Sequence, residues 1–200
     1  MWDLVLEARS LACERGGREV FRDLDFSVKS GEALELRGPN GSGKSSLLRL
    51  LAGLNKYSKG TFTLTSVIPD TVGEHAHYIG HQEATKSALS VQENLAFWST
   101  FLSGEAFSDL KSFRLDRLAD DEARLLSEGQ RRRLALSRLV AVKRPLWLLD
   151  EPTVGLDQTA LTDLRREMTS HLAQGGLIIA ATHAALGLPG IRSLELGAAT

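Results

Sequence analysis

The stretch Gly38-Pro-Asn-Gly-Ser-Gly-Lys-Ser-Ser46 decides the fold of this chain. It fits the phosphate-loop pattern G-x-x-x-x-G-K-[ST] without a mismatch, and this pattern predicts a bound nucleoside triphosphate. Glycines in the loop let successive backbone N–H groups turn toward phosphate oxygens, and the helix that follows adds its positive end. Lys44 is expected to reach the β- and γ-phosphates, and the Ser45 hydroxyl is placed to ligate Mg²⁺. The expected phosphate-binding residues are Gly38, Pro39, Asn40, Gly41, Ser42, Gly43, Lys44, Ser45 and Ser46.

The residues on either side of the loop agree with this interpretation. Residues 33–37 alternate between apolar and polar as a strand does, and an apolar helical pattern with four leucines follows Lys44. Strand, loop and helix in this order are what a phosphate loop requires. The order disfavours the alternative of a glycine-rich turn that matches the pattern by chance.

Length and composition set limits on the class of protein. The chain has 200 residues, 42% of them hydrophobic, which indicates one domain with a subdomain. Its net charge of −1 gives no electrostatic indication of nucleic-acid binding. Cys13 is the single cysteine, so a disulfide framework is excluded and a reducing compartment is expected. No leader sequence and no long apolar window are visible, and we expect a chain that is neither exported nor membrane-spanning.

The remaining chain predicts an α/β fold that begins with antiparallel strands. Strands at 2–12 and 19–28 are joined by Arg15-Gly-Gly-Arg18, a turn typical of hairpins. Further strands are expected at 61–66, 77–81, 146–149, 177–181 and 192–196. Capping boxes begin helices at Ser90 and Ser127, and residues 161–172 have the pattern of an amphipathic helix that ends at a Gly-Gly pair.

Two acidic residues follow the apolar run 146–149. This run is too short for a helix and reads as a strand buried on both faces of a parallel sheet. Asp150 at its end is placed to hold Mg²⁺ through water, and Glu151 is the candidate to activate the attacking water. The alternative, that both carboxylates only cap a helix, is disfavoured by the intact phosphate loop.

With these motifs in this order, the chain resembles the nucleotide-binding subunits of ATP-binding cassette (ABC) transporters, from the first hairpin to His183. The resemblance implies a P-loop NTPase fold with a RecA-like core, an N-terminal antiparallel β subdomain and an inserted helical subdomain. The core would take about residues 1–82 and 143–200, and the helical subdomain about 83–142. The implied cofactors are ATP and Mg²⁺.

The resemblance also implies roles for individual residues. Residues 38–45 match Walker A, 146–150 match Walker B, 126–130 resemble the family signature and 155–157 the D-loop. The implied catalytic residues are Lys44, Gln82 of the Q-loop, Glu151 as base and His183 of the H-loop. The implied metal ligands are Ser45, Gln82 and Asp150. The implied nucleotide contacts outside Walker A are Ser127, Gly129 and Gln130.

The signature predicts a homodimer. Ser127, Gly129 and the helix behind them form a second anion site, yet the chain has no second Walker A to pair with it. Two copies would therefore face head to tail, with each γ-phosphate between Lys44 of one copy and the signature of the other. ATP would hold this interface together and hydrolysis would release it.

Within the family, the chain is similar to the haem-export ATPases of bacterial cytochrome c maturation. This implies integral membrane permease subunits as partners, a peripheral position at the cytoplasmic face of the bacterial inner membrane, no nucleic acid and no haem bound directly. Another ABC importer or exporter ATPase would share every motif. A soluble, nucleic-acid-associated ABC ATPase is a further alternative.

Some residues depart from the family or leave choices open. Cys13-Glu14-Arg15 occupies the place of the usual adenine-stacking aromatic residue, and Arg15 could stack its guanidinium plane on the base instead. Glu128 replaces a common glycine of the signature and is expected to point away from the phosphate site. His75, His77 and His81 are interpreted as ordinary strand and loop histidines rather than a metal or haem site. The aromatic residues Phe97, Trp98 and Phe101 fit a docking surface and a subdomain core equally well.

Overall fold

A computed structural model describes residues 2–65, 69–103 and 110–197, and it contains two sheets. The central sheet is parallel, with five strands in the order β5-β6-β7-β3-β8. Its strands are β3 (Ala33–Arg37), β5 (Ala76–Ile79), β6 (Leu146–Asp150), β7 (Leu177–Ala181) and β8 (Arg192–Glu195). The predicted α/β class is confirmed, and the predicted last strand lies at an edge of this sheet.

The second sheet is antiparallel and has three strands in the order β2-β1-β4. Its strands are β1 (Val5–Arg15), β2 (Arg18–Lys29) and β4 (Lys59–Leu64). The turn between β1 and β2 has φ of 57° at Gly16 and 74° at Gly17, and two positive φ values in a two-residue loop match the twist of a hairpin. Residue 66, the predicted end of the third strand, lies outside the described residues.

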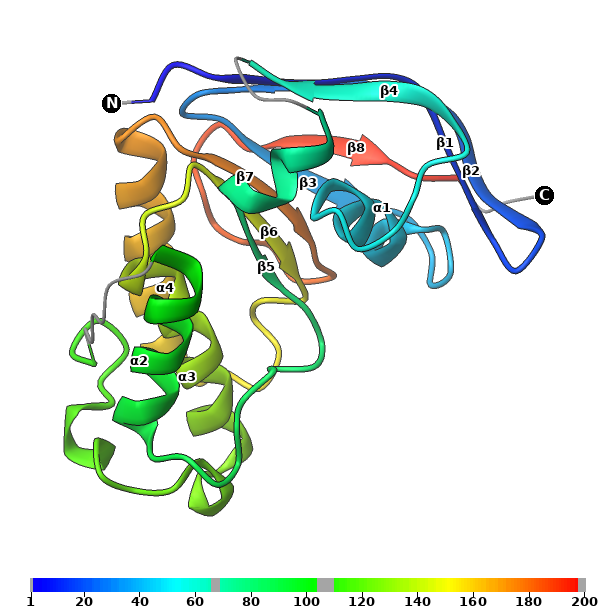
Figure 1. The fold of residues 1–200 in the computed structure, drawn as a ribbon. Coiled ribbons are helices and arrows are strands. Elements are labelled where there is room, and N and C mark those ends of the chain that lie inside the picture. The colour runs from blue at the N-terminus through cyan, green and yellow to red at the C-terminus, as the bar shows by residue number, and fades with distance from the viewer. Residues whose placement is uncertain (1, 66–68, 104–109, 198–200) are drawn as a thin grey trace.

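Helix α1 (Lys44–Leu51) lies between the two sheets (Figure 1). Its four leucines are buried in one cluster with apolar side chains of β1, β2, β3 and β4. Residues of β6 and β7 alternate between this cluster and the other face of the sheet: Leu146 and Leu148 point to α1, while Trp147 and Leu149 join the opposite cluster. Burial on both faces explains why the run 146–149 is continuously apolar.

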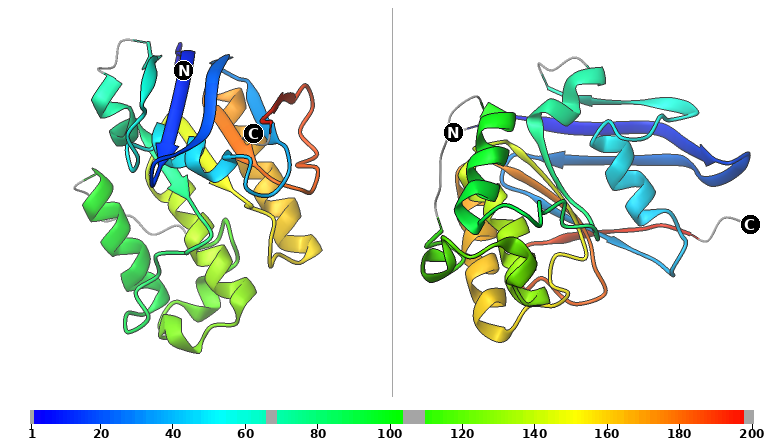
Figure 2. Two further views of the ribbon diagram at one scale, coloured as in Figure 1. Left: turned by 90° about the vertical axis from the view of Figure 1, so that its right-hand side faces the viewer. Right: turned by 60° about the horizontal axis from the view of Figure 1, so that its bottom comes forward.

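The opposite face of the parallel sheet is covered by helices (Figures 1 and 2). They are α2 (Val91–Ser103), α3 (Glu128–Ala141) and α4 (Gln158–Ala173). Short 3₁₀ turns lie at Pro69–His75, Asp116–Leu118 and Ala123–Leu125. Both views of Figure 2 show α2 and α3 side by side, projecting away from the antiparallel sheet. No helix within the described ranges is long and apolar enough to cross a membrane.

Each of these three helices begins at a side chain that caps it. Ser90 Oγ accepts a hydrogen bond from the Glu93 amide at 3.1 Å, while the Glu93 carboxylate accepts one from the Ser90 amide at 2.8 Å. Ser127 and Gln130 make the same reciprocal pair at the start of α3. Asp157 caps α4 by accepting from the Ala160 amide at 2.7 Å. The capping boxes predicted from the sequence are therefore formed as expected.

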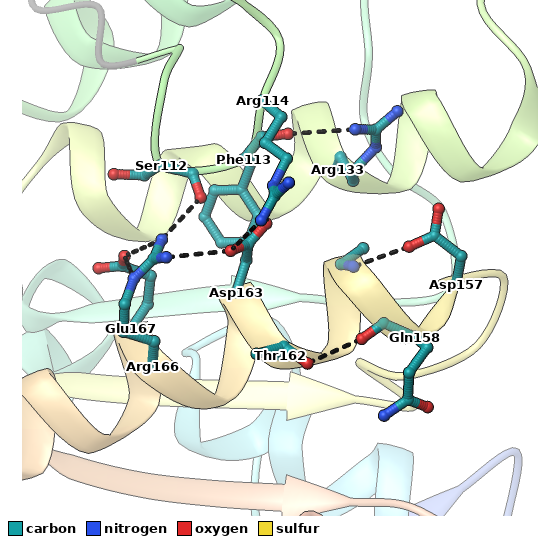
Figure 3. A network of polar contacts seen from close by, with 11 residues as sticks. Ser112, Phe113, Arg114, Arg133, Asp157, Gln158, Thr162, Asp163, Arg166 and Glu167 are labelled. Atoms are coloured by element: carbon teal, nitrogen blue, oxygen red, sulfur yellow. Dashed lines mark hydrogen bonds and ion pairs between the residues drawn. The ribbon is translucent and has the colours of Figure 1, made fainter.

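A polar network ties the segment after α2 to α4 (Figure 3). Asp163 on α4 is buried, and its carboxylate accepts hydrogen bonds from Arg114 Nε at 2.7 Å and from Arg166 Nη1 at 3.0 Å. Arg166 also donates to the Ser112 carbonyl at 3.1 Å. Asp163 lies on the second turn of α4, six residues after Asp157, so the network fixes the helix that starts at the predicted D-loop.

Candidate nucleotide-binding site

A cavity of about 800 Å³ opens at the carboxyl ends of the parallel strands, next to the start of α1. Ligands of parallel α/β sheets bind at this edge, because the loops that follow the strands meet there. Its lining comes from the hairpin, the phosphate loop, and the segments after β5, β6 and β7. The lining residues are Arg15, Val20, Asn40, Gly41, Gly43, Lys44, Ser45, Ser46, His81, Asp150, Glu151, Thr153, Val154, His183 and Ala184.

The backbone of the phosphate loop depends on glycine at two positions in particular. Gly38 has φ of 133°, and a Cβ there would collide with the carbonyl of Leu196. Gly43 has φ of 98°, and its Cβ would lie 2.7 Å from Cγ1 of Val20. Gly43 is also the N-cap of α1 and has no side chain to cap it, so the first amides of the helix face the cavity without a side-chain acceptor. An anion is the natural acceptor for those amides.

Lys44 is folded onto the loop that carries it. Its ammonium donates hydrogen bonds to the carbonyls of Gly38 at 2.7 Å and Pro39 at 3.0 Å, and its side chain is largely buried. These carbonyls keep the charge at the cavity wall beside the N-terminus of α1. A phosphate in the cavity would meet both the ammonium and the helix amides.

Ser45 and Asp150 form the acidic end of the cavity. Ser45 Oγ donates to Asp150 Oδ1 at 3.1 Å, across 105 residues of chain. Asp150 is buried, and its second oxygen, Oδ2, has no hydrogen-bond partner among the described residues. A buried carboxylate oxygen without a partner is costly unless a cation or water meets it, and a hydroxyl beside a carboxylate is an oxygen pair suited to Mg²⁺. The two residues therefore fit the metal that the sequence predicts.

Glu151 and His183 lie next to each other on the wall of the cavity. His183 Nε2 lies 3.6 Å from Glu151 Oε1 and 3.1 Å from Asn40 Oδ1, which brings the ends of β6 and β7 to the phosphate loop. The backbone of Glu151 has φ of 48°, a left-handed conformation that is strained for a residue with a Cβ. Its amide donates to the Ala181 carbonyl at 2.8 Å, which holds the peptide in place. A carboxylate on a strained, anchored backbone beside a phosphate site is suited to orient water.

The hairpin supplies the end of the cavity where a base would lie. Arg15, the last residue of β1, and Val20 on β2 both line it. Cys13 is buried in the core and does not reach the cavity. The guanidinium of Arg15 is therefore the planar group available at this end, and its stacking on a base stays a prediction.

Gln82 is placed apart from the other predicted ligands. It lines a second hollow of about 640 Å³ between α1, β5 and α2, and it is not among the residues that line the nucleotide cavity. His81, one residue earlier, lines both. The role of Gln82 as a ligand of Mg²⁺ and water would require the segment after β5 to move.

The signature residues also lie away from the cavity of their own chain. Ser127, Gly129 and Gln130 at the start of α3 do not line it, and Gly129 instead packs against the D-loop, where an added Cβ would lie 2.9 Å from the Gly155 carbonyl. Glu128 is exposed on the first turn of α3 beside Gly155. These residues are therefore separate from the nucleotide cavity of their own chain, and their role toward the nucleotide of another copy stays a prediction.

The second hollow combines aromatic and basic side chains. Phe101 lines it and is 70% exposed, while Trp98 lies under the guanidinium of Arg138, 4.7 Å from the ring centroid. Burial lowers the pKa of Arg138 to about 10. The histidine at 77 is buried under this hollow, where its Nε2 lies 2.7 Å from the Val142 carbonyl and burial lowers its pKa to about 3.

Several cavity residues were not singled out from the sequence as nucleotide contacts. Val20, His81, Thr153, Val154 and Ala184 line the cavity without belonging to the predicted motifs. The signal available for Thr153 and Val154 was their position directly after Asp150 and Glu151, on the loop that leaves β6. No signal in the sequence marked Val20, because it faces the loop only through the pairing of β1 with β2.

Comparisons with known proteins bear on this site. The sequence pattern of the family described as ABC transporter matches residues 21–154. The cytochrome c biogenesis ATP-binding export protein CcmA of Rhodopseudomonas palustris strain BisB5 is 52% identical over all of both chains. The CcmA protein of Chelativorans sp. strain BNC1 is 45% identical over 96% of this chain and 98% of its own.

Solved structures resemble the fold as a whole. A structure described as the ATP binding subunit of an ABC transporter has a TM-score of 0.80 at 26% identity, and the match covers 90% of this chain and 79% of that one. The ATP-binding cassette MJ0796, solved as a dimer in a post-hydrolysis state with ADP and Pi, has a TM-score of 0.77 at 21% identity, over 90% of this chain and 88% of that one.

Proposed function

The chain belongs to the ABC transporter family and is an ATP-binding, ATP-hydrolysing subunit, and we propose that it powers the export step of cytochrome c biogenesis with haem as the cargo. Support for the pathway comes from relatives about half identical over their whole length and named for this process. ATPase activity is supported above all by one cavity at the edge of the sheet, which is lined by Lys44, Ser45, Asp150, Glu151 and His183.

The hydrolysis mechanism follows from the positions of these residues. Lys44 exchanges its hydrogen bonds with the Gly38 and Pro39 carbonyls for the phosphates of ATP, and its charge stabilises the negative charge of the transition state. Glu151 accepts a proton from the attacking water, and His183 is close enough to Glu151 to orient the same water and the γ-phosphate. Ser45 and Asp150 would hold Mg²⁺, which, when bound, neutralises charge on the β- and γ-phosphates.

A complete site is proposed to need two copies of the chain. Within α3, the Ser127 amide is taken by Gln130 Oε1 and the Gln130 amide by Ser127 Oγ. The intervening amides of Glu128 and Gly129 are first-turn amides, which have no acceptor within a helix. They and the dipole of α3 suit the γ-phosphate held by another copy. ATP would then hold the two copies together, and its hydrolysis would separate them.

The permease subunits are proposed to dock in the hollow that contains Gln82 and Trp98. Exposed aromatic side chains on α2 next to a cavity of about 640 Å³ are suited to an apolar helix of a partner. Gln82 lines this hollow, and His81, the residue before it, lines the nucleotide cavity. A partner in the hollow could therefore move the segment that reaches the nucleotide. We propose that the chain lies peripherally at the cytoplasmic face of the inner membrane and does not contact haem directly.

A single substitution tests the ATPase part of the proposal. Glu151→Gln removes the base but keeps the shape of the side chain, so we expect turnover to fall roughly 100-fold or more while ATP binding persists. In the presence of ATP, this variant should then accumulate as a stable dimer, which size-exclusion chromatography with light scattering would detect. Glu74→Gln, at an exposed acidic residue away from the cavity, is the matched control and should behave as the unchanged chain. Turnover by the Glu151→Gln chain at the unchanged rate would remove Glu151 from its role.

The export part is tested separately, in bacteria that lack their own CcmA relative. The unchanged chain, supplied together with the permease genes of its source organism, is expected to restore covalently attached haem in c-type cytochromes. The Glu151→Gln chain should not restore it. An active ATPase that fails to restore the haem signal while co-purifying with an unrelated permease would assign it to another transporter.

A further inference from the structure

The side chain of Arg132 on α3 donates hydrogen bonds to backbone carbonyls just after β5 and at the end of β6. Its side chain is buried, with the residue only 5% exposed. Nη1 donates to the Gly80 carbonyl at 2.9 Å, and Nη2 donates to the carbonyls of Asp150 at 3.1 Å and Glu151 at 2.7 Å. One guanidinium therefore joins the segment after β5 to the residues that end β6.

The contact with Glu151 bears on the strained part of the site. With φ of 48°, Glu151 keeps its conformation only if its surroundings hold it. The Glu151 amide donates to the Ala181 carbonyl, and the Glu151 carbonyl accepts from Arg132. Neighbouring elements therefore fix the peptide groups on both sides of the Glu151 Cα. Without Arg132, the carbonyl side of this residue would lose its anchor, and the direction of the Glu151 carboxylate would follow the relaxed backbone.

Burying a guanidinium is costly, which argues against a purely space-filling role. Burial lowers the pKa of Arg132, and the nearby carboxylates of Glu83, Asp150 and Glu151 oppose that shift. A buried charge is retained where several acceptors meet it, and three carbonyls do so here. The neighbouring Arg133, by contrast, makes one side-chain hydrogen bond within the described part of the chain, to the Phe113 carbonyl at 3.4 Å.

We infer that Arg132 is a positioning residue for the ATPase reaction: it holds the backbone of Glu151 so that the carboxylate points at the attacking water. The inference rests on the proposed role of Glu151 and deepens it. Because Arg132 lies on the helix that begins with Ser127, it also joins the catalytic base of one chain to the element proposed to meet the other chain's nucleotide. Closure of the dimer would therefore change the position of Glu151 through α3.

The test separates turnover from binding. Arg132→Lys keeps the charge but cannot span three carbonyls, and Arg132→Met keeps most of the volume and none of the hydrogen bonds. We expect kcat to fall about 10-fold or more with Lys and further with Met, since a shift of about 1 Å in a reacting group can cost roughly 100-fold. KM for ATP should stay within about threefold, because the phosphate loop is untouched. Arg133→Met is the matched control and should keep the unchanged kcat.

A double substitution shows whether Arg132 acts through Glu151. In the Glu151→Gln background, Arg132→Lys should reduce the residual turnover no further, because residues that act as a unit are not additive. Two results would overturn the inference: an unchanged kcat in Arg132→Lys, or a reduction that multiplies with that of Glu151→Gln. A chain that hydrolyses no ATP before any substitution would instead overturn the proposed function. Thermal unfolding of each variant, compared with Arg133→Met, shows whether a lower kcat reflects lost folded protein.

Discussion

Because of the buried His171 on α4, we expect the free energy of unfolding to decrease on mild acidification. Its ring is stacked on Trp147 of β6, with centroids 3.9 Å apart and an angle of 11° between the planes, and Trp2 contacts it from another side. The residue is only 5% exposed, and this burial lowers its pKa from 6.5 to about 4. The imidazole is therefore neutral in the folded chain at pH 5 but protonated in the unfolded chain.

The sign and the size of the effect follow from this difference. A base whose pKa is lowered by folding binds fewer protons in the folded state, so stability is full above pH 6.5 and is lost as the pH falls toward 4. Between pH 7.5 and pH 5, His171 should remove about 2 kcal/mol from the free energy of unfolding, given its two pKa values. For a domain of this length, that loss corresponds to a decrease of roughly 4 to 8 °C in Tm.

The measurement is urea unfolding of the unchanged chain and of His171→Phe at both pH values. Phenylalanine keeps an aromatic ring against Trp147 but cannot be protonated, so His171→Phe should lose about 2 kcal/mol less than the unchanged chain over this interval. Any packing cost of the larger ring acts equally at both pH values and cancels in the comparison. The buried His77 titrates in both proteins and cancels as well. Equal losses in the two proteins would show that the His171 ring is protonated in the folded state and would refute the reasoning.

Two further predictions concern the Asp163 network and the base end of the cavity. Asp163→Asn should lower the free energy of unfolding by about 1 to 3 kcal/mol in urea, because it replaces one of the two acceptor oxygens with a donor NH₂ and removes the negative charge. The guanidinium groups of Arg114 and Arg166 are about half exposed and can turn to water, which keeps the cost low. An unchanged stability would contradict the network. With Arg15 and Val20 at the base end of the cavity, ATP and GTP should compete within a few-fold of each other, and a preference of tenfold or more in a competition titration would show that another group reads the base.

The sequence predicted the parts of the site that are encoded locally. The phosphate loop, both capping boxes and the hairpin turn at Gly16 and Gly17 each depend on residues a few positions apart, and all are formed in the structure. The apolar run before Asp150 was assigned to a strand buried on both faces, and its side chains do alternate between two clusters. In each case, one short segment carries both the signal and its physical cause.

The contacts that could not be predicted join distant segments. Arg132 meets carbonyls at residues 80, 150 and 151, and backbone carbonyls leave no mark on the residue types that bear them. Asp163 lies within the predicted amphipathic helix, and the contacts with Arg114 and Arg166 show why its carboxylate can be buried there. Both arrangements depend on how α3 and α4 pack on the sheet, which periodicity alone does not determine.

In the segment after β5, two adjacent residues line different cavities, which a sequence motif could not predict. Strand β5 ends at Ile79, and beyond it His81 lines the nucleotide cavity while Gln82 lines only the neighbouring hollow. The family resemblance implies that Gln82 contacts the metal. A motif gives the position of a residue along the chain but not the direction of its side chain, which depends on how the chain bends after the strand. Arg132 holds the Gly80 carbonyl at that bend, and the same guanidinium holds Glu151. A partner that moves Gln82 toward the cavity would therefore act on the backbone that Arg132 joins to Glu151. If the proposed docking site and the proposed role of Glu151 both hold, docking at the hollow would change the orientation of the Glu151 carboxylate.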